Sequence, residues 1–255
     1  MKRFLALVYG IFCYALFLGT LLYAIGFVGN VGVPKSIDSG SAPAPLTAAL
    51  MDALLLSLFA IQHSVMARHR FKQQWTRVVS WYLERSTFVL AATLALALVL
   101  WQWRPIPRVI WDLRGTASGS LLAILSWTGW GVLLLSTFLI NHFELFGLEQ
   151  VWAYFRQREF HRPPFKTPLF YAWVRHPVYL GFIIAFWSAP VMTAGHLLFA
   201  IATTGYILVG ISYEERDLIR IYGEAYRDYR RRVPMLFPWR RRAPELPEQA
   251  DRQAA

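Results

Sequence analysis

Charged residues are scarce in this chain of 255 residues. Asp, Glu, Lys and Arg make up 16% of it and hydrophobic residues 56%, whereas an ordinary soluble domain has about 25% charged residues. This composition argues against a soluble globular protein. The few charges are unbalanced, with 26 Lys and Arg against 15 Asp and Glu and a net charge of +11. Basic residues must therefore lie between the apolar segments, which is typical of a membrane protein with basic loops.

Cysteine is nearly absent. The one cysteine, Cys13, lies inside the first apolar segment, which excludes an internal disulfide and a thiolate-clustered zinc or iron–sulfur site. The spacings His-x-x-Glu-His and His-Glu-x-x-His of metalloenzymes are also missing. We therefore expect no metal centre.

Long uncharged segments predict an all-α, polytopic integral membrane protein, because about 20 apolar residues cross a bilayer core of about 30 Å. Four spans are predicted at about residues 4–28, 46–67, 86–103 and 120–140. The apolar stretch 177–213 is too long for one upright helix and slightly short for two, and Pro190 and Gly195 interrupt it. It predicts a helical hairpin, giving five to six crossings. The first span is interpreted as retained, because a signal peptide has a shorter apolar core and a small-residue cleavage site.

The basic residues of the loops predict the orientation. Alternating the loops between the two sides puts 22 of the 26 Lys and Arg on one side, which the positive-inside rule makes cytoplasmic. The other four are Lys35, Arg104, Arg108 and Arg114. Both termini are therefore predicted to be cytoplasmic. A single crossing in 177–213 would export the arginine-rich tail, which this distribution disfavours.

We expect one membrane domain over residues 1–242, with N-terminal spans at 4–141 and the hairpin and tail at 167–238. Residues 243–255 are expected to be a disordered tail. The segment 151–166 is too short and too charged to cross, so it is predicted to lie on the inner membrane surface.

A surface amphipathic helix is predicted after the hairpin. Tyr222, Tyr226 and Tyr229 are spaced as one face of a helix, with Arg and Asp on the other. A basic amphipathic helix beside a bilayer favours anionic lipid over nucleic acid, so we expect lipid contact and no nucleic-acid partner.

Nine polar residues flank the predicted spans, and the predicted topology puts all of them near the cytoplasmic interface. Polar groups at the end of a span either snorkel to nearby water or mark a functional site. Their number and common depth favour a site. They are Gln62, His63, Asn141, His142, Glu144, Arg175, His176, Glu214 and Glu215.

The segment around Pro177 is the most informative. Pro177 suits the first residue of a helix, so free N–H groups and the positive end of the helix dipole lie beside Arg175 and His176. Such a place attracts an anion, either a cofactor carboxylate or a lipid headgroup. Gly181, one turn later, permits close approach of a ligand or of a neighbouring helix.

Glu214 and Glu215 lie at the other end of the hairpin. They could pair with Arg216 or Arg220; alternatively, they could accept the hydroxyls of a ribose or balance a cation. If the hairpin closes, these acids face the anion site, and one pocket with a positive wall and a negative wall follows.

The last third of the chain carries motifs that resemble the membrane methyltransferase superfamily, which includes isoprenylcysteine carboxyl methyltransferases and phospholipid N-methyltransferases. The resemblance implies S-adenosylmethionine bound at the cytoplasmic end of a helical hairpin, with the first motif and the glutamate pair contributing contacts. Tyr179 and Tyr226 could line the adenosine or lie near the sulfonium. The motifs are Arg175-His176-Pro177-x-Tyr179-x-Gly181, Glu214-Glu215-x-x-Leu218, Tyr222-Gly223-x-x-Tyr226-x-x-Tyr229 and Val233-Pro234.

A narrower likeness extends over residues 1 to about 238. The chain is similar to bacterial methanethiol S-methyltransferases, which implies methylation of methanethiol to dimethyl sulfide, with hydrogen sulfide as a second acceptor. Denitrification-associated membrane proteins share part of these patterns. The segments that carry the likeness are 27–30, 34–38, 62–67, 84–87, 101–105, 141–148 and 193–200.

The implied chemistry is an in-line methyl transfer to a thiolate, in which alignment of the reacting atoms supplies most of the catalysis. An alkyl thiol has a pKa above the ~8.5 of cysteine, so its deprotonation at neutral pH costs at least roughly 2 kcal/mol. Arg175 could help electrostatically. The candidate bases are His176, His142, His63 and Glu144.

Other functions remain open at this stage. The same geometry would suit a methyltransferase for a prenylcysteine or a lipid. A non-catalytic membrane protein that binds a nucleotide-like ligand or supports assembly of a respiratory complex is a second class. A transporter ranks last, because it would be expected to have paired inverted halves with broken helices in both.

Overall fold

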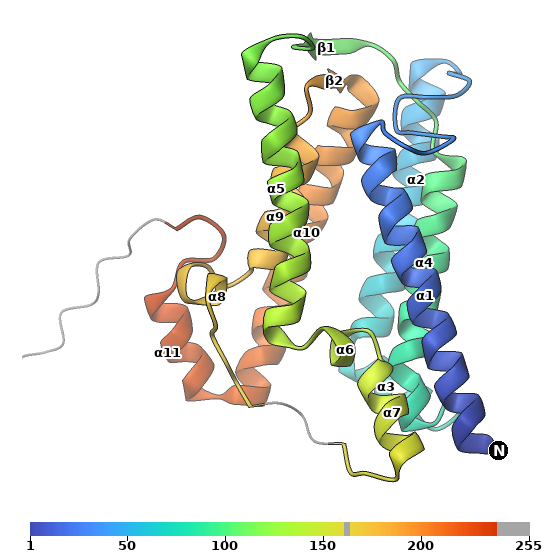
Figure 1. The fold of residues 1–255 in the computed structure, drawn as a ribbon, viewed down its shortest axis with the longest axis vertical. Helices are drawn as coiled ribbons and strands as arrows, with labels where there is room; N and C mark the ends of the chain where they lie inside the picture. Colours follow the sequence, from blue (N-terminus) through green and yellow to red (C-terminus); the bar gives the residue numbers. More distant parts are fainter. Residues whose placement is uncertain (161–163, 239–255) are drawn as a thin grey trace, which may run out of the picture.

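Long helices running along one axis form the body of the molecule (Figure 1). The computed structural model describes residues 1–160 and 164–238, so the tail predicted at 243–255 lies outside the described residues. Within the described part, five helices are long and apolar enough to cross a membrane, which confirms the polytopic, mainly α-helical fold. They are α1 (Lys2–Gly29), α2 (Pro45–Ala67), α4 (Trp81–Gln102), α5 (Ala117–Ile140) and α10 (Ala194–Tyr222).

The expected hairpin is present, with arms of unequal length. Its first arm, α9 (Pro177–Trp187), has 11 residues and at 1.5 Å per residue is only about 17 Å long. Its second arm, α10, has 29 residues. The side chain of Thr193 caps α10 by accepting a hydrogen bond from the His196 amide at 3.1 Å. Because α9 is short, the chain segment that precedes it enters the bundle rather than staying at its end.

A small pairing of strands departs from the all-α expectation. Strand β1 (Val109–Asp112) pairs antiparallel with β2 (Val191–Thr193), with Val109 opposite Thr193 and Asp112 opposite Val191. Trp111 adds a hydrogen bond from its indole nitrogen to the Ala189 carbonyl at 3.0 Å. The pairing ties the loop before α5 to the turn of the hairpin, at the end of the bundle opposite the N-terminus (Figure 1).

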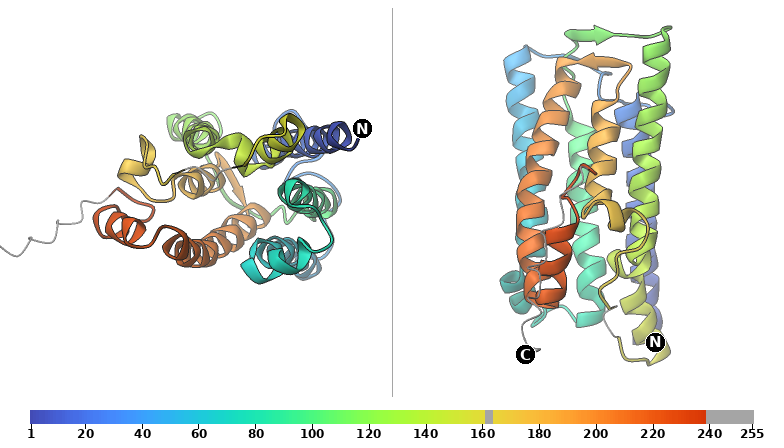
Figure 2. Two further views of the ribbon diagram at one scale, coloured as in Figure 1. Left: turned by 90° about the horizontal axis from the view of Figure 1, so that it is seen from below. Right: turned by 90° about the vertical axis from the view of Figure 1, so that its left-hand side faces the viewer.

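Short helices gather toward the other end of the bundle (Figure 2). One of them, α7, docks on α1, where fully buried Val151 lies against Gly10. The predicted surface segment 151–166 is therefore held by the protein at its beginning. These helices are α3 (His69–Trp75), α6 (His142–Leu145), α7 (Leu148–Arg156), α8 (Phe170–Trp173) and α11 (Glu224–Arg232).

Packing between the long helices runs in the order α5, α9, α10, α2, α4 and α1. The main hydrophobic cluster lies in the half of the bundle near the strands, where Trp103 makes edge contacts with Phe27 and Phe199. Buried polar side chains occur in both halves of the described bundle: Asp52 and His196 lie near the strands, whereas Arg175, His176 and Glu215 lie in the opposite half. The fold thus combines a main hydrophobic cluster near the strands with a group of buried charged side chains in the other half, where a site can form.

Candidate functional site

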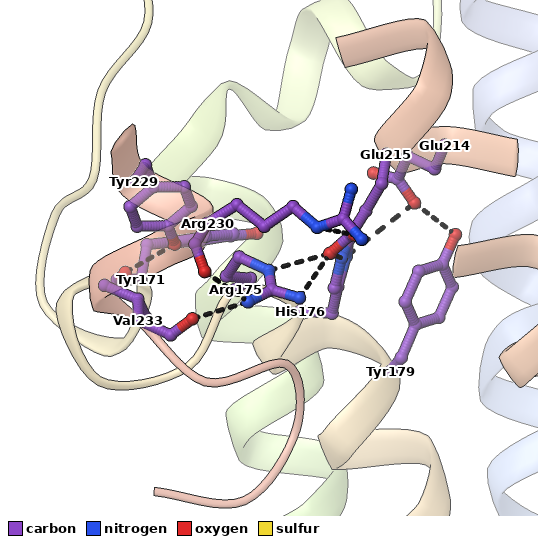
Figure 3. A network of polar contacts seen from close by, with 9 residues as sticks. All are labelled: Tyr171, Arg175, His176, Tyr179, Glu214, Glu215, Tyr229, Arg230 and Val233. Carbon is purple, nitrogen blue, oxygen red and sulfur yellow. Dashed lines mark hydrogen bonds and ion pairs between the residues drawn. The ribbon is translucent and has the colours of Figure 1, made fainter. Parts of the chain in front are cut away.

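The two ends of the hairpin meet (Figure 3). Arg175, two residues before α9, donates from Nε to Oε1 of Glu215, near the end of α10, at 2.7 Å. The exposed fractions of the two side chains are 3% and 7%, so this is a buried ion pair. The expectation that the closed hairpin brings these two groups together is confirmed.

Arg175 also anchors the C-terminal segment. Its backbone amide donates to the Pro234 carbonyl at 2.9 Å, and its Nη1 donates to the carbonyls of Arg230 at 3.1 Å and Val233 at 2.5 Å. The guanidinium of Arg175 therefore donates its hydrogen bonds to groups of the chain itself. Within the predicted pocket, Arg175 of the positive wall thus pairs directly with Glu215 of the negative wall, because a buried guanidinium needs its counter-charge in direct contact.

Glu215 is surrounded by donors. Besides Arg175, it interacts with Nε2 of His176 at 3.2 Å through Oε1 and with Nε of Arg230 at 3.1 Å through Oε2. The alternative partner Arg220 pairs with Asp217 instead. Both oxygens of Glu215 are thus engaged, and this carboxylate joins α9, α10 and α11.

Glu214 has a different environment. Its side chain is 42% exposed, and its Oε2 accepts a hydrogen bond from the Tyr179 hydroxyl at 2.8 Å while lying 3.9 Å from Nδ1 of His176. Its Oε1 has no hydrogen-bond partner in the described part of the chain. Of the two adjacent glutamates, Glu214 is therefore the one whose carboxylate can accept a further hydrogen bond from a ligand.

The tyrosine face of α11 packs into the protein. Tyr226 is 1% exposed and Tyr229 is 5% exposed; Phe165 contacts both rings, and the Tyr229 hydroxyl donates to the Tyr171 carbonyl. The predicted amphipathic helix exists as α11, and Phe165 and the hairpin ends cover Tyr226 and Tyr229 on its tyrosine face. Burial raises the pKa of both hydroxyls, which keeps them protonated.

A cavity of about 270 Å³ adjoins the ion pair, close to the lower end of the ~300–1,000 Å³ typical of small-molecule sites. Its wall combines apolar side chains with one carboxylate and two guanidinium groups. Nearby, the buried hydroxyl of Tyr226 has no hydrogen-bond partner among the described residues. A ligand with apolar, anionic and hydroxyl groups fits these surroundings. The lining includes Leu208, Ile211, Glu215, Arg216, Arg230 and Met235.

Comparison with known proteins decides the family. A family model described as a protein of unknown function (DUF1295) matches residues 68–233. Methanethiol S-methyltransferase 1 of Bradyrhizobium diazoefficiens is 56% identical over 94% of this chain and 84% of its own length. Methanethiol S-methyltransferase of Mycobacterium tuberculosis is 54% identical over 94% of this chain and 98% of its own length. This chain belongs to the methanethiol S-methyltransferase family.

A more distant relative lies outside that group: Nurim of Homo sapiens is 33% identical over 66% of each chain. No solved structure matches the chain significantly. For a member of the methanethiol S-methyltransferase family, the closed hairpin and the cavity beside it are the candidate active site, because they contain the motifs shared with membrane methyltransferases.

Two of the predicted residues lie in a separate cluster. His142 donates or accepts through both ring nitrogens, with the Tyr14 hydroxyl at 2.8 Å and Thr137 Oγ1 at 2.8 Å, and its ring stacks on Phe138. Burial lowers the pKa of His142. Glu144 lies in the same short helix, α6, which Asn141 caps by accepting a hydrogen bond from the Glu144 amide at Oδ1. Within the described part of the chain, the side-chain partners of Glu214 and Glu215 include His176 and Tyr179 but not His142.

Arg85 is a residue that the sequence reasoning missed. It lies in the first turns of α4, where the prediction had placed a loop. Its guanidinium interacts electrostatically with Glu144, Glu214 and Tyr179, so it faces the hairpin from the opposite side of the bundle. The sequence signal that could have identified Arg85 is its position directly before the span predicted at residues 86–103.

Proposed function

We propose that this chain transfers the methyl group of S-adenosylmethionine to methanethiol, giving dimethyl sulfide, at the cytoplasmic face of a bacterial inner membrane. The observation that carries the proposal is that the motif residues of the two hairpin ends converge, in a chain more than half identical to proteins named for this reaction. An apolar, volatile thiol can dissolve in the bilayer, which gives a reason for a membrane-embedded site.

The residues around the hairpin fit the methyl donor. We assign Glu214 to the ribose hydroxyls or the amino group, because its Oε1 has capacity left and its side chain is partly exposed. Arg230 borders the cavity and is 52% exposed, which suits the donor's carboxylate. The Tyr226 hydroxyl offers a buried hydrogen bond, and the ring of Tyr179 offers a face to a cation.

Other motif residues support these contacts. We assign Arg175 and His176 to positioning, because they hold Glu215 and the segment that follows α11. Pro177 starts α9 and Gly181 lets it pack on α5. S-adenosylmethionine supplies the electrophilic methyl group, and the protein has to align the thiol sulfur with it at near-attack distance.

Purified protein in detergent, given labelled S-adenosylmethionine and methanethiol, tests the proposal directly. We expect labelled dimethyl sulfide in the headspace, and hydrogen sulfide as acceptor should yield labelled methanethiol. Parallel reactions with a prenylcysteine analogue and with phospholipid should remain unlabelled. Label in either of those acceptors, with none in dimethyl sulfide, would replace the proposed substrate. Binding of S-adenosylmethionine without turnover of any thiol would replace the enzyme by a non-catalytic binding protein.

A further inference from the structure

Arg85 is partly buried at the start of α4. Its Nε donates to the Leu145 carbonyl at 2.7 Å, and the guanidinium lies over the ring of Phe88 at 5.1 Å. In the described part of the chain, no carboxylate oxygen lies within salt-bridge distance of it and no acceptor is recorded for its two Nη groups. Glu84 and Glu144 offset its charge only from a distance. A positive charge fixed in this way can stabilise an anion that arrives beside it.

His63 contacts the same phenylalanine. Its ring is 5.0 Å from the ring of Phe88, and it stacks on Phe59 at 5.5 Å. Tyr206 meets it edge-on at 6.4 Å. The Nδ1 atom of His63 is buried and has no hydrogen-bond partner among the described residues. A buried ring nitrogen without a hydrogen-bond partner destabilises the folded protein unless a ligand supplies that partner.

Arg85 directly, and His63 through Tyr206, are linked to the groups proposed to hold the methyl donor. The guanidinium of Arg85 interacts electrostatically with Glu214 and with Tyr179, which donates to Glu214 at 2.8 Å. Tyr206, which contacts His63, also interacts electrostatically with Tyr179. The polar interior thus has a negative end at Glu214, which suits a sulfonium, and a positive end at Arg85, which suits a thiolate.

We propose that Arg85 and His63 form the thiol-binding end of the site, an inference that rests on the proposed function. The thiol proton moves to Nδ1 of His63 and the sulfur becomes a thiolate beside Arg85. The sulfur electron pair forms a bond to the methyl carbon, and the electron pair of the broken carbon–sulfonium bond stays with the departing thioether. The products are dimethyl sulfide, S-adenosylhomocysteine and a protonated His63, which then releases its proton to water. Phe59 and Phe88 surround the acceptor, so they set its size.

The inference is tested with His63→Gln, Arg85→Gln and Arg85→Lys in detergent-purified protein. Exposed residues of the same region, changed in His69→Gln and Arg77→Gln, serve as matched controls. S-adenosylmethionine binding, measured by equilibrium dialysis, should stay within about twofold of wild type for every variant. Arg85→Gln should lower kcat/KM for methanethiol by about 10- to 100-fold, as expected for a lost charge-assisted interaction, and Arg85→Lys should recover part of it.

The pH profile isolates the proton transfer. The titratable or charged groups that face His63 are Arg85 from α4 and Tyr206 from α10, and Tyr206→Phe therefore joins the series. Wild-type kcat/KM should be nearly flat between pH 7 and 9. That of His63→Gln should be at least about 100-fold lower at pH 7 and should rise tenfold per pH unit, because only free thiolate then reacts. Methaneselenol, which is far more acidic than methanethiol and ionised at neutral pH, should restore turnover of His63→Gln.

The outcomes separate this inference from the proposed function. Wild-type protein that makes no dimethyl sulfide rejects the proposed function itself. Active wild type together with unchanged kcat/KM and pH profiles in the His63 and Arg85 variants overturns the thiol-binding end. Loss of S-adenosylmethionine binding in Arg85→Lys would place Arg85 in the donor site and would overturn the inference as well. Rescue by the selenol also shows that His63→Gln is folded.

Discussion

At the scale of single residues, two adjacent glutamates have opposite roles. Glu215 is almost fully buried and has both oxygens engaged by Arg175, His176 and Arg230. Glu214 is partly exposed and bonds Tyr179 through one oxygen. One of these acids therefore maintains the structure, and the other is available to a ligand.

Replacing the two acids separately distinguishes these roles. Glu215→Gln leaves the buried Arg175 without its counter-charge, which should destabilise the protein by about 3–5 kcal/mol. Glu214→Gln should leave the melting temperature in detergent within a few degrees of wild type but weaken S-adenosylmethionine binding by about 10- to 100-fold, the size of a charge-assisted hydrogen bond. Thermal melts and equilibrium dialysis measure the two effects. The reverse pattern, with Glu214→Gln unstable and Glu215→Gln merely weak in binding, would exchange the assignments.

His142 predicts a pH dependence of stability. Burial lowers the pKa of His142 in the folded protein below its ordinary value, so the unfolded chain binds a proton more readily. The neutral ring then stabilises the fold above about pH 6.5, the pKa of an unperturbed histidine, and this contribution is lost as the pH falls. Denaturation in detergent should show a smaller loss of stability between pH 7 and 5 in His142→Gln than in wild type. An equal loss of stability in wild type and His142→Gln would contradict this role of His142.

At the scale of elements, two glycines set how closely α9 approaches α5. A Cβ at Gly181 would lie 2.6 Å from the Gly129 carbonyl oxygen, and a Cβ at Gly129 would lie 2.6 Å from the Ala185 amide nitrogen. Backbone atoms cannot move aside as a flexible side chain can. The interpretation of Gly181 as a place for close approach of a neighbouring helix is therefore confirmed, and the short arm of the hairpin depends on it.

Alanine at Gly181 should push α9 away from α5. We expect Gly181→Ala to destabilise the protein by about 1–3 kcal/mol, the usual cost of overpacking, and to reduce methyl transfer by moving Arg175 and His176. Gly131→Ala, on the same helix as Gly129 but with nothing within 4 Å of the added methyl group, is the control. Melting temperature and turnover should fall together in the first variant and stay unchanged in the second. Equal melting temperatures for both variants would show that the contact is not tight.

At the scale of the whole molecule, charge predicts how the bundle sits in the membrane. The loops and helix ends near the N-terminus carry most of the basic residues, and the opposite end carries the strand pair and few of them. The candidate site lies in the half of the bundle near the basic end. The positive-inside rule therefore predicts that the site opens toward the cytoplasm, where S-adenosylmethionine is available.

Cysteine labelling measures this orientation. Cys13 is buried, so single cysteines can be introduced at exposed positions with little background. Ser41→Cys, in the segment between α1 and α2 that the positive-inside rule places outside, should react with a membrane-impermeant maleimide in intact cells from which any outer membrane has been removed. Gln74→Cys, in α3, should react only after the inner membrane is opened. Labelling of Gln74→Cys alone in intact cells would invert the predicted topology.

The sequence by itself determined the elements of the fold and the candidate chemistry. Apolar segments of about 20 residues have to become helices in a bilayer, because only a helix satisfies the backbone within one segment. Pro190 and Gly195 marked the turn of the hairpin, and the motifs at its ends indicated the methyltransferase superfamily. These features depend on residues that are close together in the sequence, so the sequence alone predicts them.

Only the tertiary structure decided which polar groups meet. Glu214 and Glu215 are neighbours in sequence, yet only the direction in which each side chain leaves α10 determines which of them is buried against Arg175. His63 and Arg85 come from different helices and meet the same phenylalanine, Phe88, because α2 packs on α4. His142 belongs to a separate cluster for the same reason. Contacts between distant segments follow from how all the helices pack together, which residue spacing along the chain does not encode.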